Sequence, residues 1–209
     1  MLLKIQILKY ISILRFEFFT RLEFELSETN TRLYRQTLIN NILYWVNSQN
    51  TGIISKPEKI SLQKRISENI SLYKIIAAGK NINISNETNQ EDFIFSDINI
   101  FDTIIRNLLS NSLKFTDTGG KITFRSARKK DIVSLEIEDT GKGISKEKLT
   151  KILNADESHR TLGTLNEQGT GLGVNLVKEF SKILDIDFDI ISEEGKGTRF
   201  ILKFHIPKK

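Results

Sequence analysis

The sequence predicts an α+β fold, a two-layer α/β sandwich in which helices lie together on one face of a mixed β-sheet. Two long stretches carry apolar residues at helical spacing, and two others alternate apolar and polar residues as half-buried strands do. The third observation is size, because 209 residues with 39% hydrophobic side chains allow one full domain and a helical appendage. We therefore expect a helical segment over residues 1–52 and one α/β domain over residues 53–209.

The helical segment is expected to contain an amphipathic helix over residues 27–48. Ser27 is its candidate N-cap, and polar residues and Gly52 follow its end. Its apolar side consists of Leu33, Leu38, Ile42, Trp45 and Val46. Residues 1–26 begin with an apolar stretch that is too short for a transmembrane helix and that contains two lysines. We expect an amphipathic extension there and no membrane span in this chain.

The next forty residues should form short elements that lead into the main helix. Their pattern favours a strand at 59–62, a helix that Gly79 ends, and strands near 81–85 and 92–95. The inward positions of that helix are expected to be Ile66, Ile70, Tyr73 and Ile76.

The main helix is predicted over residues 97–115, with Asp97 as its N-cap. Its apolar side consists of Phe101, Ile104, Ile105, Leu108, Leu109 and Leu113. Asn107, Asn111 and Lys114 line the opposite, exposed side at spacings that let them reach a common ligand. An amide oxygen and phosphates together suit Mg²⁺, and the lysine would neutralise phosphate charge. For this helix alone, an ordinary solvated polar face is the alternative.

A strand over residues 132–139 ends in an acidic residue. Asp139 is in phase with the apolar side of this strand, so its carboxylate should point inward, where it needs a hydrogen-bond donor. The exocyclic amine of adenine is one such donor, and Gly141 and Gly143 would let the backbone pass close to a flat ligand. The alternative is a turn in which Asp139 binds its own backbone.

A second amphipathic helix is expected to begin at a glycine-rich stretch. The stretch consists of Gly169, Thr170, Gly171, Leu172 and Gly173. Glycines at a helix start free the first N–H groups to face an anion, and the helix dipole favours negative charge there, so phosphates fit. The helix should bury Leu176, Val177, Phe180, Ile183 and Leu184. It runs past Asp185 with no glycine to mark its end.

Further strands complete the expected sheet. A hairpin should join a strand at 122–124 to the one that ends at Asp139, with its turn at Lys129 and Lys130. The final strands are expected near 187–191 and 200–206.

Together, these motifs resemble those of the sensor histidine kinases, members of the GHKL superfamily of ATPases with the Bergerat fold. Residues 107–115 are similar to the N box, 139–143 to the G1 box, 169–173 to the G2 box, and 195–200 to the short glycine motif before the last strand. The similarity extends from about residue 38 to residue 207, and four motifs in the right order make it specific.

The resemblance implies that the chain binds ATP and Mg²⁺. It implies that Asn111 ligates the metal, that Asn107 and Lys114 contact the phosphates, and that Asp139 binds adenine. The remaining cofactor-binding residues would be Gly141, Gly143, Thr198 and the five residues of the glycine-rich stretch 169–173. Residues 144–168 would form the lid over ATP.

Asn107 separates the kinase branch of this superfamily from its ATPases. Gyrase, chaperone and mismatch-repair members carry a glutamate at this position, which activates water. A carboxamide cannot accept a proton as a general base. We therefore expect ATP to be held for transfer rather than hydrolysed.

Neither of the two histidines looks like a phosphoacceptor. Family members phosphorylate a histidine on the first helix of a dimeric hairpin, whereas His159 falls in the expected lid and His205 on the outer side of the last strand. Residues 27–48 resemble the second helix of that hairpin. We expect a chain without the first half of the hairpin, which dimerises with a histidine kinase hairpin, phosphorylates it and serves a response regulator indirectly. The alternative is a non-catalytic ATP-binding module that pairs with intact kinases and modulates them.

The composition excludes other function classes. The absence of cysteine excludes a disulfide framework, which suits a cytoplasmic protein. The net charge of +5 is spread along the chain, without the basic stripe or interleaved aromatic residues of a nucleic-acid-binding protein. We expect ATP as the ligand and no nucleic-acid partner.

Overall fold

The computed structural model of the protein describes residues 55–154 and 172–206. The helix predicted at 27–48 and the extension before it lie outside these residues. In the described part of the chain, no helix is both long and apolar enough to cross a membrane.

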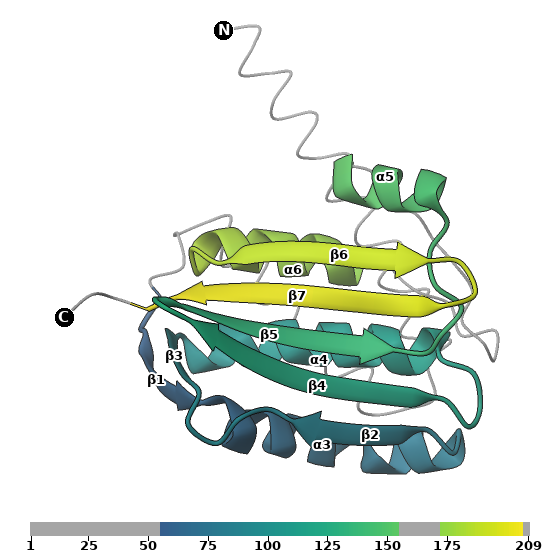
Figure 1. The fold of residues 1–209 in the computed structure, drawn as a ribbon, viewed down its shortest axis with the longest axis horizontal. Helices are drawn as coiled ribbons and strands as arrows, with labels where there is room; N and C mark the ends of the chain where they lie inside the picture. Colours follow the sequence, from purple (N-terminus) through teal and green to yellow (C-terminus); the bar gives the residue numbers. More distant parts are fainter. Residues whose placement is uncertain (1–54, 155–171, 207–209) are drawn as a thin grey trace, which may run out of the picture. The chain divides into compact units, whose positions relative to one another are not determined.

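A mixed five-stranded sheet forms one layer of the fold (Figure 1). The strand order is β2-β4-β5-β7-β6, and only β2 and β4 pair in parallel. The strands are β2 (Asn83–Glu87), β4 (Lys121–Lys129), β5 (Ile132–Asp139), β6 (Asp187–Glu193) and β7 (Gly197–His205). β1 (Glu58–Ser61) and β3 (Phe93–Ser96) form a separate antiparallel pair.

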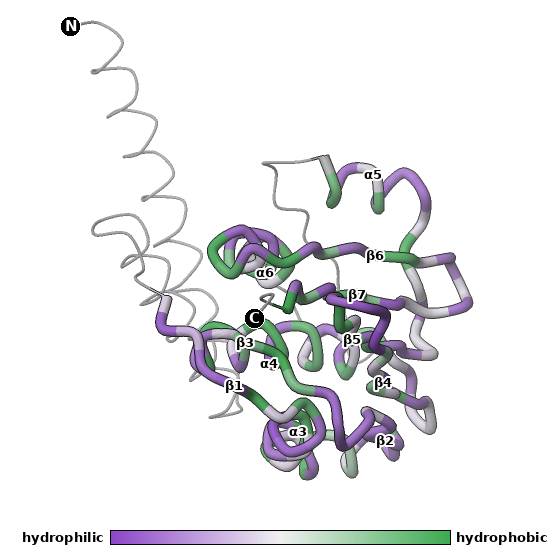
Figure 2. The backbone as a smooth tube through the Cα atoms, turned by 60° about the vertical axis from the view of Figure 1, so that its left-hand side comes forward, coloured by the Kyte–Doolittle hydropathy of each residue, from purple (hydrophilic) through white to green (hydrophobic). Residues whose placement is uncertain are grey.

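Three helices form the second layer and cover one face of the sheet. They are α3 (Leu62–Gly79), α4 (Ile98–Phe115) and α6 (Leu172–Ile183). Figure 2 shows α4 between the other two, with α3 beside β2 and α6 beside β6. The short helix α5 (Lys146–Asn154) contacts β6. The two-layer α+β sandwich predicted from the sequence is therefore confirmed.

The core lies between the sheet and the helices. Strand residues that point toward the helices are buried, namely Ile122, Phe124, Leu135, Ile137, Leu202 and Phe204. The buried residues of the helices include Tyr73, Phe101, Ile104, Leu108, Val177 and Phe180. The rings of Phe101 and Phe204 lie 5.9 Å apart and join α4 to the central strands. This contact follows from the two periodicities, because each element presents its apolar side to the other.

The ends of α3 and α6 use left-handed residues that are not glycine. Asn81 has a φ of 51° and Asp185 a φ of 52°. After α3, the Ile82 N–H donates to Ala77 O over 2.9 Å, which is the long hydrogen bond of a Schellman motif. α3 ends at Gly79 as predicted, but the residue that turns the chain is Asn81. Asp185 takes the same place after α6, which explains how that helix ends without a glycine.

Several boundaries differ from the prediction: α6 ends at Ile183 rather than past Asp185, β4 extends to Lys129, and β7 begins at Gly197. Leu62 begins α3 rather than ending β1, and its side chain is fully buried. The β4–β5 turn consists of Lys130 and Asp131, because Lys129 still pairs with Ile132 and Lys130 takes a left-handed φ of 55°. The predicted turn was therefore one residue too early.

Candidate functional site

Parts of four elements meet at one end of the sheet (Figure 1). They are the last turns of α4, the end of β5, the β6–β7 turn with the first residues of β7, and the first turn of α6. The described residues of all four motifs singled out in the sequence therefore come together, although the motifs are far apart along the chain.

The carboxylate of Asp139 points inward at the end of β5 and is 4% exposed. Its Oδ1 accepts hydrogen bonds from the backbone N–H groups of Gly141 (3.0 Å) and Thr198 (3.1 Å). Its Oδ2 accepts one from the hydroxyl of Ser112 on α4 (2.9 Å). The bond to Gly141 is the local turn that the sequence offered as the alternative. Asp139 thus does both: it forms the turn and it is buried.

The groups that bind Asp139 are all neutral among the described residues. Burial raises the pKa of Asp139 above its ordinary value, and the hydrogen bonds from Gly141, Ser112 and Thr198 oppose this shift. A carboxylate offers about four acceptor positions, and the three hydrogen bonds leave one of them on Oδ2. A ligand N–H group can use this position.

The polar residues of α4 are less exposed than predicted. Asn107 and Lys114 are each 6% exposed, whereas Asn111 is half-buried. The prediction of an exposed polar side was wrong because α4 is the central helix and α6 packs against it. The amide nitrogen of Asn107 donates to Thr103 O (2.7 Å), which fixes this side chain against its own helix.

The first turn of α6 lies directly against the two amides of α4. A Cβ atom on Gly173 would lie 3.2 Å from Asn107 Oδ1 and 3.5 Å from Asn111 Nδ2, which is tight for the first contact. Glycine therefore allows the helix start to approach both amides closely. Leu172 is the first residue of α6. Gly169, Thr170 and Gly171 lie outside the described residues.

The last turn of α4 is tied to the segment after β5. The N–H of Lys142 donates to Phe115 O over 3.0 Å, and a Cβ atom on Gly141 would lie only 2.4 Å from that oxygen. From the other side, the buried ammonium of Lys80 donates to Leu113 O (2.8 Å) and Lys114 O (3.3 Å). These contacts fix the part of α4 that carries Lys114.

A row of polar residues crosses three strands beside Asp139. Asp139 pairs with Thr198 on β7, and Thr198 pairs with Ser192 on β6. The Ser192 hydroxyl accepts from the Ile144 N–H (2.8 Å) and lies 2.9 Å from the Thr198 hydroxyl. Gly143 lies just before Ile144, against the backbone of Glu193. The segment after Asp139 is thereby attached to the β6–β7 hairpin.

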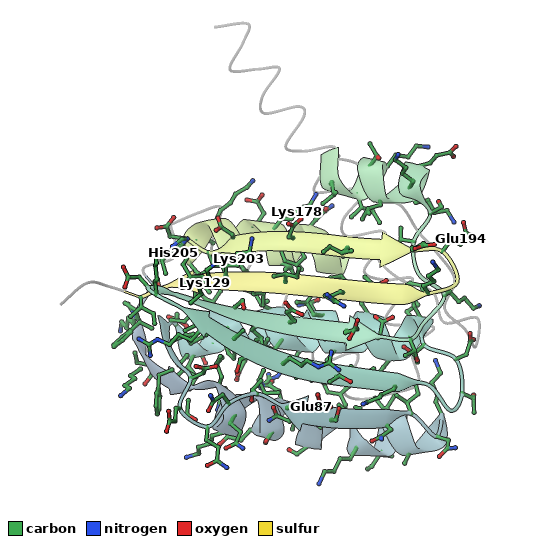
Figure 3. The ribbon with its side chains drawn as sticks, in the orientation of Figure 1. Glu87, Lys129, Lys178, Glu194, Lys203 and His205 are labelled. Carbon is green, nitrogen blue, oxygen red and sulfur yellow. The ribbon has the colours of Figure 1, made fainter. Side chains whose placement is uncertain are left out.

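Only the first part of the expected lid, residues 144–154, is described, and most of it forms α5. The ammonium of Lys178 on α6, labelled in Figure 3, donates to the Ile152 and Leu153 carbonyls at the end of α5. A cation at a helix C-terminus satisfies carbonyls that have no partner within the helix. Lys178 therefore joins α5 to α6.

Ser112 and Ser192 are the residues that the sequence reasoning missed. Ser112 lies four residues after Leu108 on the apolar side of α4 and is 1% exposed. A buried hydroxyl needs a hydrogen-bond partner, so the position of this serine on the apolar side could have identified it from the sequence. Nothing in the sequence pattern identifies Ser192, because its contacts depend on which strands pair.

The opposite face of the sheet carries an ion-pair ladder. Glu138 on β5 binds Arg125 on β4 (2.5 Å) and Arg199 on β7 (2.6 Å). Arg125 also binds Glu87 on β2 (3.1 Å). The two arginines lower the pKa of Glu138, with Arg199 the larger cause. His205 lies on this outer surface as predicted, at the end of β7 away from Glu194 (Figure 3), and is 3.4 Å from Asp187.

The chain matches one protein family and many histidine kinases. The family described as histidine kinase-, DNA gyrase B-, and HSP90-like ATPase matches residues 96–208. An uncharacterized sensor-like histidine kinase of Rhizobium meliloti is 36% identical over 109 residues, 52% of this chain and 21% of that protein. Sensor histidine kinase GraS of Staphylococcus haemolyticus is 32% identical over 149 residues, 70% of this chain and 42% of that protein. The chain thus spans less than half the length of these relatives.

Solved histidine kinase structures share the fold. The nucleotide-free catalytic domain of histidine kinase ThkA has a TM-score of 0.62 at 23% identity and covers 72% of this chain and 95% of that one. Full-length ShkA in complex with AMPPNP has a TM-score of 0.67 at 20% identity and covers 96% of this chain and 47% of that one.

Proposed function

Because this chain belongs to the family of histidine kinase-, DNA gyrase B- and HSP90-like ATPases, we propose that it binds Mg-ATP and transfers the γ-phosphoryl group to a histidine on a partner chain. The observation that carries the proposal is the meeting of three groups at one end of the sheet. They are the amides of α4, the first turn of α6 and the buried carboxylate of Asp139.

The base of the nucleotide would bind at Asp139. The remaining acceptor position on its Oδ2 suits the exocyclic amine of adenine, since the other positions already hold protein donors. Gly141 and Gly143 carry the chain past this point, and Thr198 lies beside Asp139 on the neighbouring strand. These four residues form the proposed base subsite.

The phosphates would lie between α4 and the start of α6. Asn107 and Lys114 would contact them, with Lys114 supplying positive charge from the last turn of α4. The N-terminus of α6 would add backbone N–H groups and the favourable end of the helix dipole. In the proposal, Leu172 and Gly173 contribute this helix start, and Gly169, Thr170 and Gly171 complete the stretch.

Asn111 is the proposed ligand of Mg²⁺. Its half-buried amide forms no side-chain hydrogen bond within the described residues, and it lies beside the first turn of α6, where a Cβ atom on Gly173 would come within 3.5 Å of it. Magnesium commonly takes one or two protein oxygens and completes its shell with water and phosphate, so a single amide oxygen fits. The bound ion would neutralise charge on the phosphates, while Asn111 orients them.

Transfer rather than hydrolysis follows from the chemistry of Asn107. By the resemblance, this residue would take the position of the base that activates water in the ATPases, and its amide nitrogen already donates to Thr103 O. An amide cannot take a proton from water. With no base at this position to activate water, the bound ATP would remain available for a histidine acceptor.

The acceptor would belong to a partner chain. His205 is exposed beside Asp187, at the opposite end of β7 from Thr198, and His159 lies outside the described residues. We place the acceptor on a histidine kinase hairpin that dimerises with residues 1–52, and a response regulator would receive the phosphoryl group next. This would occur in the cytoplasm, where ATP is abundant.

Nucleotide binding is tested with a fluorescent ATP analogue and Mg²⁺. We expect Asn111→Ala to lower affinity at least about 100-fold while the protein stays folded, because a ligand to the metal is lost. Ser110→Ala, one position earlier on α4, is the matched control and should bind normally. Unchanged affinity of Asn111→Ala would refute the assignment.

Phosphoryl transfer is tested by mixing the chain and γ-labelled ATP with a helical hairpin from an intact histidine kinase. We expect acid-labile label on the hairpin histidine, and none when the chain carries Asn111→Ala. If no label is transferred at saturating Mg-ATP, the chain is instead an ATP-binding module that modulates intact kinases.

A further inference from the structure

We propose that Ser192 determines base specificity by fixing the direction of the Thr198 hydroxyl, so that the two side chains of the base subsite present only hydrogen-bond acceptors. Asp139, Thr198 and Ser192 lie in one row across β5, β7 and β6. The inference rests on the proposed function and goes beyond it, because Ser192 need not touch the nucleotide.

The hydrogen bonds of Ser192 are complete. A serine hydroxyl has one proton to donate and two lone pairs that accept. Its partners are Gly197 O at 2.9 Å, the Ile144 N–H at 2.8 Å and the Thr198 hydroxyl at 2.9 Å. A carbonyl can only accept, so the Ser192 proton goes to Gly197 O. The backbone N–H of Ile144 can only donate, so it takes one lone pair.

The direction of the last bond follows from the other two. With the Ser192 proton already used, the Thr198 hydroxyl must donate to the second lone pair of Ser192. The Thr198 proton is then occupied. Its oxygen keeps only lone pairs for any further contact, and Thr198 is an acceptor toward a ligand.

The adjacent Asp139 is likewise a hydrogen-bond acceptor toward a ligand. Its carboxylate is acceptor-only when ionised, and one acceptor position on Oδ2 is unused. Asp139 and Thr198 are cross-strand neighbours that are both buried, so a ligand edge that reaches one lies near the other. Two acceptors side by side favour an amine on the ligand and repel a carbonyl.

The chemistry therefore selects a 6-aminopurine over a 6-oxopurine. Inosine triphosphate has a carbonyl in place of this amine and a proton on the neighbouring ring nitrogen N1, so it is the probe. With the unaltered chain we expect ATP to bind about 100-fold more tightly than inosine triphosphate. Ser192→Ala releases the Thr198 proton, which can then donate to the carbonyl, and the ratio of the two affinities should fall about tenfold.

Two variants show whether the hydroxyl itself is responsible. Ser192→Thr keeps the hydroxyl and should restore the ratio to within about threefold of the unaltered chain. Ser134→Ala is the matched control: Ser134 is also a strand serine that donates to a carbonyl, Ala127 O at 3.1 Å, but it lies on the other face of the sheet. This control should leave the ratio unchanged.

The outcomes separate the inference from the proposed function. An unchanged ratio in Ser192→Ala, or a chain that binds both nucleotides equally, would overturn the role of Ser192 and leave ATP binding intact. A chain that binds neither nucleotide would overturn both. If Ser192→Ala does not fold in a thermal unfolding assay, Thr198→Val serves as the test variant. It should lower the affinity for ATP but not that for inosine triphosphate, and an equal loss of affinity for both nucleotides would overturn the inference.

Discussion

Two neighbouring carboxylates on opposite faces of the sheet have different partners and opposite pKa shifts. Glu138 and Asp139 are consecutive residues of β5. Glu138 points to the open face, where Arg125 and Arg199 bind it and lower its pKa. Asp139 points to the helices, where only neutral groups bind it and burial raises its pKa.

The contrast shows which acid is available for a ligand. Glu138 is already paired with cations, which makes it part of a surface that stabilises strand pairing. Asp139 is held in place by three weaker, neutral donors and keeps one acceptor position. A buried carboxylate without a cation is unusual for a purely structural residue and typical of a functional site.

The largest effect should come from Asp139→Asn. The amide keeps one oxygen for the Gly141 and Thr198 N–H groups but presents an N–H donor where the ligand amine would bind. We expect nucleotide affinity to fall more than about 100-fold while the protein stays folded. Titration with a fluorescent ATP analogue and circular dichroism together measure this. Normal binding by Asp139→Asn would show that the base does not reach this carboxylate.

The next effect is an opposite pH dependence of stability at the two acids. The pKa of Asp139 is raised in the folded protein above its ordinary value of 3.8, so the folded state binds more protons at this site than the unfolded state does. The contribution of Asp139 to stability is therefore lost as pH rises from 3.8 through the folded-state pKa. The folded-state pKa of Glu138 is lowered below 4.5, so its contribution is present above that value and is lost as pH falls. In urea unfolding from about pH 3 to about pH 7, the unfolding free energy of Asp139→Asn relative to that of the unaltered chain should therefore increase as pH rises. The unfolding free energy of Glu138→Gln relative to that of the unaltered chain should decrease over the same range. If both variants follow the pH dependence of the unaltered chain, the assigned directions of the two pKa shifts are contradicted.

A smaller effect is expected from Ser112→Ala. This change removes the one donor to Asp139 Oδ2, so the carboxylate is less well oriented and its pKa should rise further. We expect nucleotide affinity to fall about three- to tenfold. Ser110→Ala, at a half-buried position of the same helix, is the control. Equal behaviour of the two variants in calorimetric titration would mean that the Ser112 hydroxyl has no such role.

The smallest effect should come from Glu138→Gln. Exposed ion pairs contribute little, so we expect a loss of about 0.5 kcal/mol in unfolding free energy. Nucleotide affinity should stay within about twofold, because the side chain lies on the other face of the sheet from Asp139. Chemical denaturation and ATP titration measure both values. A large loss of affinity would remove the distinction between the two faces.

The sequence predicted the elements and the family well because these depend on local patterns. The spacing of Phe101, Leu108 and Leu113 located α4, and Asp97 marked its start, where it accepts hydrogen bonds from Asn99 and Ile100. The alternation of β5 placed Asp139 on the buried side. Periodicity says which way a side chain points.

The sequence could not predict what each side chain meets. Asn107 looked exposed because the packing of α6 against α4 is a tertiary contact that no local pattern encodes. Ser192 reaches Thr198 only because β6 and β7 pair in one particular register. The left-handed Asn81 and Asp185 also escaped prediction, since such a conformation is expected first of glycine.

The ammonium of Lys80 helps to hold the end of α4 in place before any ligand binds. Together with the N–H groups of Thr116 and Lys142, it occupies the carbonyls at the end of α4. This turn should resist fraying and exchange its amide protons slowly even without ligand. Ligand arrival would then require little ordering of α4, so this part of the site is rigid before the encounter.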